Sequence, residues 1–114
     1  MSGQEARLDQ ALRAVADVTR RRILRLVADD ERSAGAIAAN FTMTRPAVSQ
    51  HLRVLHDAGL VDVRRDGTRR LYRARPEAMA EIRAALDAMW TDRLVALTHA
   101  AEREEWPQRA KKAR

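Results

Sequence analysis

The segment from Thr44 to Leu60 carries start and stop signals for one short helix, and these signals constrain the fold most. Thr44 is a good N-cap, because its hydroxyl can accept a hydrogen bond from a first-turn N–H that lacks an intrahelical partner. Pro46 falls in that first turn, where a missing N–H costs nothing. Gly59 can enter the left-handed conformation without a Cβ penalty and supplies the stop. The sequence therefore predicts a helix that begins after Thr44 and ends just before Gly59.

The two sides of this helix differ in chemistry. One side is an apolar stripe at helical spacing, made of Val48, Leu52 and Leu55. Gln50, Arg53 and Asp57 lie roughly opposite this stripe, and Ser49 lies on its flank. A hydroxyl, an amide and a guanidinium are groups that read base edges and contact phosphates in a DNA major groove. A surface helix that binds nothing would show the same amphipathic pattern, so the helix alone does not decide the function.

A β-hairpin is predicted directly after this helix. The residues from Leu60 to Ala74 form two alternating runs around Asp66-Gly67, which is a strong hairpin signal. The hairpin carries five arginines: Arg64, Arg65, Arg69, Arg70 and Arg73. A helix preceded by a short helix-turn and followed by a basic hairpin is the pattern of a winged helix-turn-helix. We therefore expect a mainly α fold with about five helices and a two-stranded antiparallel hairpin as its wing.

These motifs together resemble a known family. The segment SAGAIAANFTMTRPAVSQHLRVLHDAGLVDVRRDGTRRLY, preceded by ADVTRRRIL, is similar to the ArsR family of bacterial transcriptional repressors, over roughly Leu12 to Leu97. Its most diagnostic part is RPAVSQHLRVLHDAGLV with the arginine-rich wing. Val18 stands where the family usually has proline, and Thr42 where it often has glycine. The resemblance implies a homodimeric, sequence-specific repressor that places two helices in successive major grooves of a palindromic operator.

The helix and the wing together supply the candidate DNA-binding residues. They are Thr44, Arg45, Ser49, Gln50, His51, Arg53, Arg64, Arg65, Arg69 and Arg70. We expect Gln50 and Arg53 to face base edges or groove walls, and the wing arginines to contact phosphates or a narrow minor groove. His51 matches the family's Ser-x-His-Leu position and is expected to support the helix or to touch a phosphate.

The distribution of charge agrees with this interpretation. The chain has a net charge of +6, and residues 20–75 hold thirteen arginines against six acidic residues. Residues 76–106 hold three arginines against seven acidic residues. A basic middle beside an acidic C-terminal segment is typical of a domain that presents one face to a polyanion. Arg20, Arg21, Arg22 and Arg25 crowd one predicted helix, where a solvated charged face and an occasional phosphate contact fit about equally well.

The remaining helices are predicted at about Glu5–Ala16, at about Val18–Ala28 after the N-cap Asp17, and after the N-cap Ser33. Pro76 opens a long terminal helix whose apolar stripe is too long for a small core to cover. A second copy of the chain would cover it, so we expect dimerisation through Leu8, Leu12, Met79, Ile82, Leu86, Met89, Trp90, Leu94 and Leu97. Residues 1–106 would form one domain, and residues 107–114 a basic flexible tail.

Several functional classes lack support in the sequence. With no cysteine there is no thiolate metal site or disulfide, and no phosphate-binding loop or hydrolase motif occurs, so no enzyme is expected. Many ArsR-like repressors hold a metal between terminal helices, but Met89 stands where the first histidine would be, leaving His99 and Glu102 without it. We expect no metal and no cofactor. No apolar run suggests a membrane span or a signal peptide, so a cytoplasmic location is expected.

Two alternatives to a repressor remain open. The chain could bind DNA chiefly to hold another protein through Trp90, Trp106 and the terminal helix, as an antitoxin-like protein does. It could also be a nucleoid-type binder with little sequence preference. The sequence does not identify an effector.

Overall fold

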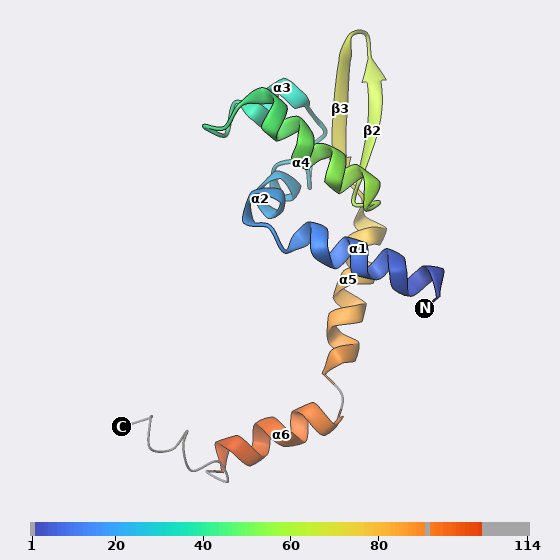
Figure 1. Cartoon of the computed structure of the whole chain (residues 1–114), viewed down its shortest axis with the longest axis vertical. Coiled ribbons are helices and arrows are strands. Elements are labelled where there is room, and N and C mark those ends of the chain that lie inside the picture. Colours follow the sequence, from blue (N-terminus) through green and yellow to red (C-terminus); the bar gives the residue numbers. More distant parts are fainter. Residues whose placement is uncertain (1, 91, 104–114) are drawn as a thin grey trace. The chain divides into compact units, whose positions relative to one another are not determined.

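Six helices and three strands make up the part of the chain that a computed structural model describes, residues 2–90 and 92–103 (Figure 1). The helices are α1 (Gly3–Val15), α2 (Val18–Leu26), α3 (Ala34–Ala38), α4 (Arg45–Asp57), α5 (Pro76–Met89) and α6 (Asp92–Glu102), and the strands are β1 (Arg32–Ser33), β2 (Val61–Asp66) and β3 (Arg69–Ala74). The chain divides into two units, residues 1–82 and 83–114. Within the described residues, no helix has the length and apolar character that a membrane span needs.

Side-chain caps fix where the first four helices begin. Ser2, Asp17, Ser33 and Thr44 each accept a hydrogen bond from the backbone N–H three residues later, at 2.9 to 3.3 Å. Each bond satisfies one of the N–H groups that a helix start leaves unpaired. The predicted caps at Asp17, Ser33 and Thr44 are confirmed, whereas the cap at Ser2 starts α1 two residues earlier than the apolar spacing indicated.

Gly59 ends α4 as predicted. Its φ is +75°, a left-handed conformation that favours glycine. The Gly59 N–H donates to the His56 carbonyl at 2.9 Å, and the Leu60 N–H donates to the Leu55 carbonyl at 3.0 Å. These two bonds form a Schellman motif, which satisfies the last carbonyls of the helix. The chain then passes from α4 into β2 within three residues.

The hairpin is confirmed, with one difference in its turn and one in the sheet. Asp66 pairs with Arg69, so the two-residue loop is Gly67-Thr68, not Asp66-Gly67. Gly67 has the positive φ, +64°, that such a turn requires. The short β1 pairs antiparallel with β3 and makes a three-stranded sheet in the order β1-β3-β2, where the sequence predicted two strands. A two-residue strand is too short to show an alternating pattern.

The terminal helix differs from the single long helix expected from the sequence. α5 ends at Met89, where the Trp90 N–H bonds the Asp87 carbonyl at 3.0 Å in a tighter turn, and α6 begins at Asp92. The apolar residues on either side of the interruption are largely exposed, including Met89 and Trp90. Helix continuity in proteins depends on packing of the apolar face more than on propensity. In the described residues of this single chain, much of that face stays exposed.

The core lies in the first unit and surrounds the apolar side of α4. Its most deeply buried residues come from α2, α3, α4 and the start of β2: Ile23, Val27, Ile37, Val48, Leu52, Leu55, Leu60 and Val61. α4 contacts α1, α2, α3 and β2. The first half of α5 also joins this core through Ile82, with Ala78 and Met79 packed against it. The predicted apolar stripe of α4 is therefore the centre of the core.

We expect Val48→Ala to lower the free energy of unfolding by about 2 kcal/mol, because it removes two methyl groups from a fully buried site. Val63→Ala is the matched control, since Val63 is 38% exposed on the hairpin, and it should cost less than about 1 kcal/mol. Chemical denaturation of both variants measures the difference. Equal losses would contradict the placement of Val48 at the centre of the core.

Candidate nucleic-acid interface

The polar side of α4 is open to solvent. Ser49, Gln50 and Arg53 are exposed, and the opposite side of the helix is buried. Thr44 and Arg45 stand at the helix start, where the helix dipole favours an anion, although the Ala47 N–H of the first turn already donates to the Thr44 hydroxyl. The Arg45 guanidinium lies beside Gly35 of α3, where a Cβ would come within 3.6 Å of it. The structure thus presents these predicted DNA-binding residues of α4 on one outward surface.

A groove separates this surface from the hairpin. It has a volume of about 570 Å³. Its polar lining comes mainly from both elements, and it is basic apart from one carboxylate. The polar lining residues are Ser33, Arg45, Ser49, Arg53, His56 and Asp57, Thr68 of the turn, and Arg69 and Arg70 of β3. Leu52, Val63 and Tyr72 add apolar lining. The groove therefore brings together arginines that lie up to 25 residues apart in the sequence.

The two faces of the hairpin carry different charges. Arg65 lies directly opposite Arg70 across the strands, and the pair Val63 and Tyr72 shares their face. Like charges directly opposite each other destabilise a sheet. Among the described residues, no carboxylate forms an ion pair with either arginine. This face therefore carries an uncompensated positive charge that a polyanion would neutralise.

The opposite face of the hairpin is compensated internally. Arg64 donates from Nε to Glu31 Oε2 at 2.9 Å, and a second bond from Nη2 to Oε1 makes the pair bidentate. This hydrogen bonding, together with the positive charge of Arg64, lowers the pKa of the Glu31 carboxyl below its usual value. Arg64 was predicted from the sequence to contact DNA, but here its guanidinium already has a partner. A phosphate contact by Arg64 would require an exchange of that partner.

Arg69 occupies an intermediate position. Its Nη2 donates to Asp66 Oδ2 at 2.9 Å, across the last pair of the hairpin. Both side chains are more than half exposed, so the pair is open to solvent and weak. Arg69 also lines the groove next to α4.

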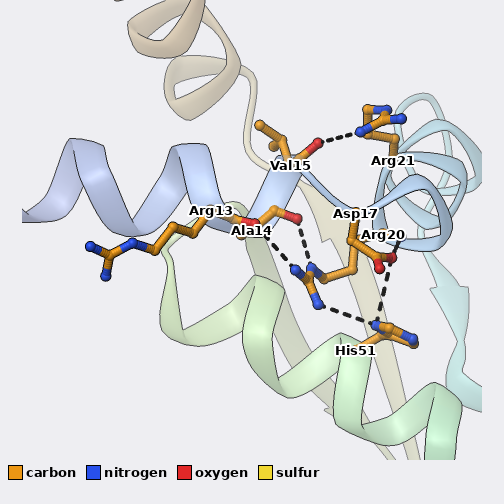
Figure 2. A network of polar contacts seen from close by, with 7 residues as sticks. All are labelled: Arg13, Ala14, Val15, Asp17, Arg20, Arg21 and His51. Atoms are coloured by element: carbon orange, nitrogen blue, oxygen red, sulfur yellow. Dashed lines mark hydrogen bonds and ion pairs between the residues drawn. The ribbon is translucent and has the colours of Figure 1, made fainter.

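His51 lies on a different side of α4 from the exposed polar residues. Its side chain is 23% exposed, and its Nδ1 is 3.4 Å from Arg20 Nη1 and 4.0 Å from Asp17 Oδ2 (Figure 2). Asp17 also accepts the Arg20 backbone N–H at 2.9 Å, and this hydrogen bond, with the nearby charge of Arg20, lowers the pKa of the Asp17 carboxyl. These contacts fit the expectation that His51 supports the helix. Contact between His51 and a phosphate stays a prediction.

The arginines of α2 have partners that the sequence analysis missed. Arg20 donates to the Ala14 and Arg13 carbonyls at 2.7 and 3.2 Å, and Arg21 donates to the Val15 carbonyl at 2.8 Å. The Arg22 guanidinium lies 4.7 Å from the centre of the Phe41 ring, a cation–π contact. A signal for Arg20 and Arg21 was present in the sequence. Each lies six positions after a residue at the C-terminal end of the first predicted helix, where backbone carbonyls need partners from outside the helix.

The residues predicted for dimerisation divide into two groups. Ile82 is buried in the core of its own chain, and Leu8, Leu12 and Met79 are partly buried. The second unit exposes the others by 41 to 66%: Leu86, Met89, Trp90, Leu94 and Leu97, together with Val95, which the sequence analysis did not name. A second copy would therefore have to cover the second unit above all. Trp106 and the predicted tail lie outside the described residues.

The candidate metal ligands lie on α5 and α6. Asp87 is on α5, and His99 and Glu102 are on α6. Within residues 2–90 and 92–103, no three His, Cys, Asp or Glu side chains are placed to hold a metal ion. Metal-independent DNA binding stays a prediction.

Comparisons with known proteins agree with this geometry. Residues 17–63 match the family model described as bacterial regulatory protein, arsR family. The chain is 46% identical over 83 residues to the HTH-type transcriptional regulator Rv2034 of Mycobacterium tuberculosis, covering 73% of this chain and 78% of that protein. It is 35% identical over 60 residues to the transcriptional repressor SdpR of Bacillus subtilis, covering 53% and 67%.

A solved structure is similar over most of the chain. It is the homodimeric winged helix-turn-helix DNA-binding domain of a possible ArsR-family transcriptional regulator from Mycobacterium bovis. The TM-score is 0.61 at 32% identity, and the match covers 93% of this chain and 91% of that one. The predicted winged helix-turn-helix is thus confirmed by its structural neighbours as well as by the elements of the chain.

The two faces of the hairpin should contribute differently to DNA binding. We expect Arg70→Thr to reduce the slope of log affinity against log salt by about 0.9 for each subunit, because one phosphate contact is lost. The same change should leave the free energy of unfolding unchanged or raise it by up to about 0.5 kcal/mol, because it removes a like-charge pair.

Arg64→Thr is the matched control on the other face, and it should change the salt slope less. Salt titrations on duplex DNA and denaturation of each variant measure both quantities. If Arg64→Thr reduced the slope as much as Arg70→Thr, the division of the hairpin into two faces would be wrong.

Proposed function

Because the chain belongs to the ArsR family of bacterial regulatory proteins, we propose that it is a homodimeric transcriptional repressor that binds a palindromic operator. The observation that carries this proposal is the groove between α4 and the hairpin. Among the described residues no ion pair involves its arginines Arg45, Arg53 and Arg70, which lie beside the exposed polar side of a helix whose other side is fixed in the core. A surface of this kind can grip a phosphate backbone and read bases at the same time.

In this proposal α4 enters the major groove. Gln50 and Arg53 contact base edges, since an amide pairs with adenine and a guanidinium with guanine in a bidentate manner. Ser49 adds a hydroxyl beside them, and Thr44 and Arg45 hold a phosphate at the helix start. The exposure of all five side chains supports these roles.

The hairpin would hold the flanking backbone. Arg65 and Arg70 have no carboxylate partner among the described residues, and Arg69 has only an exposed one. Phosphate contact would relieve the repulsion between Arg65 and Arg70, so binding of the polyanion also stabilises the wing. Their contribution would be largely independent of sequence and sensitive to salt.

Dimerisation would place two such surfaces on one duplex. The exposed apolar residues of the second unit support a second copy as the partner, as does the homodimeric state of the Mycobacterium bovis neighbour. A two-fold dimer presents its two α4 helices symmetrically, which requires an operator with matching symmetry. Such an operator in the protein's own promoter would make the repressor autoregulatory.

The antitoxin-like alternative rests on the same exposed apolar residues, with Trp90 the most exposed at 66%. A different protein on this surface would co-purify in fixed ratio with the chain. The nucleoid-type alternative differs in selectivity, because such a protein would bind the selected and scrambled duplexes with similar affinity.

Base reading by Gln50 can be tested directly. With a duplex selected by the wild-type protein from a random pool, we expect Gln50→Ala to cost about 1–3 kcal/mol of binding free energy, and less on a scrambled duplex. Gln4→Ala, at an exposed position at the start of α1, is the matched control and should leave both affinities unchanged. Equal losses on the two duplexes would remove Gln50 from the reading role, and selection of no sequence would favour the nucleoid-type alternative.

The dimer interface has its own test. We expect the double variant Leu86→Glu and Trp90→Glu to sediment as a monomer and to lose operator binding, because it places charges in the exposed apolar surface of the second unit. Val18→Glu, at an apolar residue of α2 that is 60% exposed, should remain dimeric. An unperturbed dimer in the double variant would place the interface elsewhere.

A further inference from the structure

Three helices meet at the side chain of Arg20. Its guanidinium donates from Nε to the Ala14 carbonyl at 2.7 Å and from Nη2 to the Arg13 carbonyl at 3.2 Å, both in the last turn of α1. Its Nη1 lies 3.4 Å from Nδ1 of His51 on α4 (Figure 2). Arg20 itself belongs to the first turn of α2, held by the Asp17 cap. One planar group thus joins residues that lie 31 positions apart.

Arg20 and Arg21 both bond carbonyls at the end of α1, but they differ in their contact with α4. Both place a positive guanidinium at the C-terminus of α1, where carbonyls lack intrahelical partners and the helix dipole is negative. Only Arg20 also has a hydrogen bond to α4, whereas Arg21 contacts the Val15 carbonyl alone. The chain therefore offers a natural comparison between a residue that caps α1 and one that also reaches the recognition surface.

The contact with His51 adds a directional constraint on α4 to that of its core packing. Burial of Val48, Leu52 and Leu55 determines which side of the helix faces the core, but hydrophobic burial has no directional preference of its own and tolerates small rotations. A hydrogen bond weakens when its angle or distance changes, so it resists rotation of the helix about its own axis. His51 directly follows Gln50 and is two residues from Arg53, so any rotation that breaks the contact also turns both exposed side chains.

We propose that Arg20 is a positioning residue for DNA recognition: it ties the end of α1 to His51 and thereby limits the small rotations of α4 that core packing still allows, which fixes how Gln50 and Arg53 are presented. The inference rests on the proposed function, because it concerns the DNA-binding surface of that repressor. Arg20 touches no DNA in this scheme. Its loss would alter how well α4 discriminates between sequences more than how strongly the protein grips phosphates.

The contact with Arg20 requires one protonation state of His51. An arginine can only donate, so a hydrogen bond here needs an unprotonated Nδ1, and a neutral ring would then carry its proton on Nε2. Asp17 Oδ2, 4.0 Å from Nδ1, is too distant for a hydrogen bond in this arrangement.

The test compares four variants with the wild-type protein. Arg20→Ala removes the tie and part of the α1 cap, and Arg21→Ala removes a comparable cap without touching α4. His51→Phe keeps a ring but loses the acceptor, and His51→Asn keeps an acceptor near the position of Nδ1. The probes are a duplex selected by the wild-type protein from a random pool and a scrambled duplex of the same composition.

We expect Arg20→Ala and His51→Phe each to lower the ratio of the two affinities by about five- to tenfold, and the double variant to lower it no further. His51→Asn should recover most of the ratio. Arg21→Ala should lower thermal stability about as much as Arg20→Ala and leave the ratio unchanged. Nitrogen NMR of the wild-type ring should show Nδ1 unprotonated, with a shift at Nδ1 in Arg20→Ala.

The outcomes separate the two proposals. A wild-type protein that selects a duplex, with an unchanged ratio in Arg20→Ala or an equal loss in Arg21→Ala, would overturn the positioning role alone. A wild-type protein that selects no duplex would overturn the repressor proposal and with it the positioning role. A proton on Nδ1 of the neutral ring would refute the contact itself.

Discussion

Burial of the apolar side of α4 is the interaction on which the rest of the structure depends. Val48, Leu52 and Leu55 are essentially inaccessible, and α1, α2, α3 and β2 all contact the helix that carries them. The same burial forces Ser49, Gln50 and Arg53 outward, because residues on one helix cannot share a face with its core stripe. The Schellman motif at Gly59 then directs the chain into the hairpin. Core formation and presentation of the polar surface are therefore a single event.

Ion pairs and hydrogen bonds within the chain determine which arginines remain available on the exposed surface. In the first unit, some arginines of α2 and of the hairpin have partners within the chain, and others are open to solvent. Arg20, Arg21 and Arg22 bind carbonyls or a ring, and Arg64 binds Glu31. Arg65 and Arg70 are left opposite each other on the face of the hairpin that lines the groove with Tyr72. A net charge alone could not distinguish these groups, because only the partners decide which arginines are available to a polyanion.

The sequence predicted the features whose causes are local. The caps at Asp17, Ser33 and Thr44, the stop at Gly59 and the hairpin depend on residues within a few positions of one another. The pairs Arg20–His51 and Arg64–Glu31 join residues 31 and 33 positions apart, so only the fold brings them together. The strand β1 was too short to be recognised, and apolar spacing alone overstated the length of the terminal helix. The prediction that wing arginines contact DNA is therefore weakest for Arg64, because its partner Glu31 lies in a loop that is distant in the sequence.

The Glu31–Arg64 pair has a consequence for how such a protein would find its site on a chromosome. The strength of nonspecific DNA binding depends on the number of phosphates that a protein neutralises. Each further phosphate contact lengthens the time that the protein stays at a nonspecific site. In the proposed repressor, the ion pair with Glu31 would hold one wing arginine away from the DNA backbone and would limit the grip of the hairpin on the wrong sequences. A carboxylate outside the groove would thus favour a faster search, at the expense of some affinity for the final target.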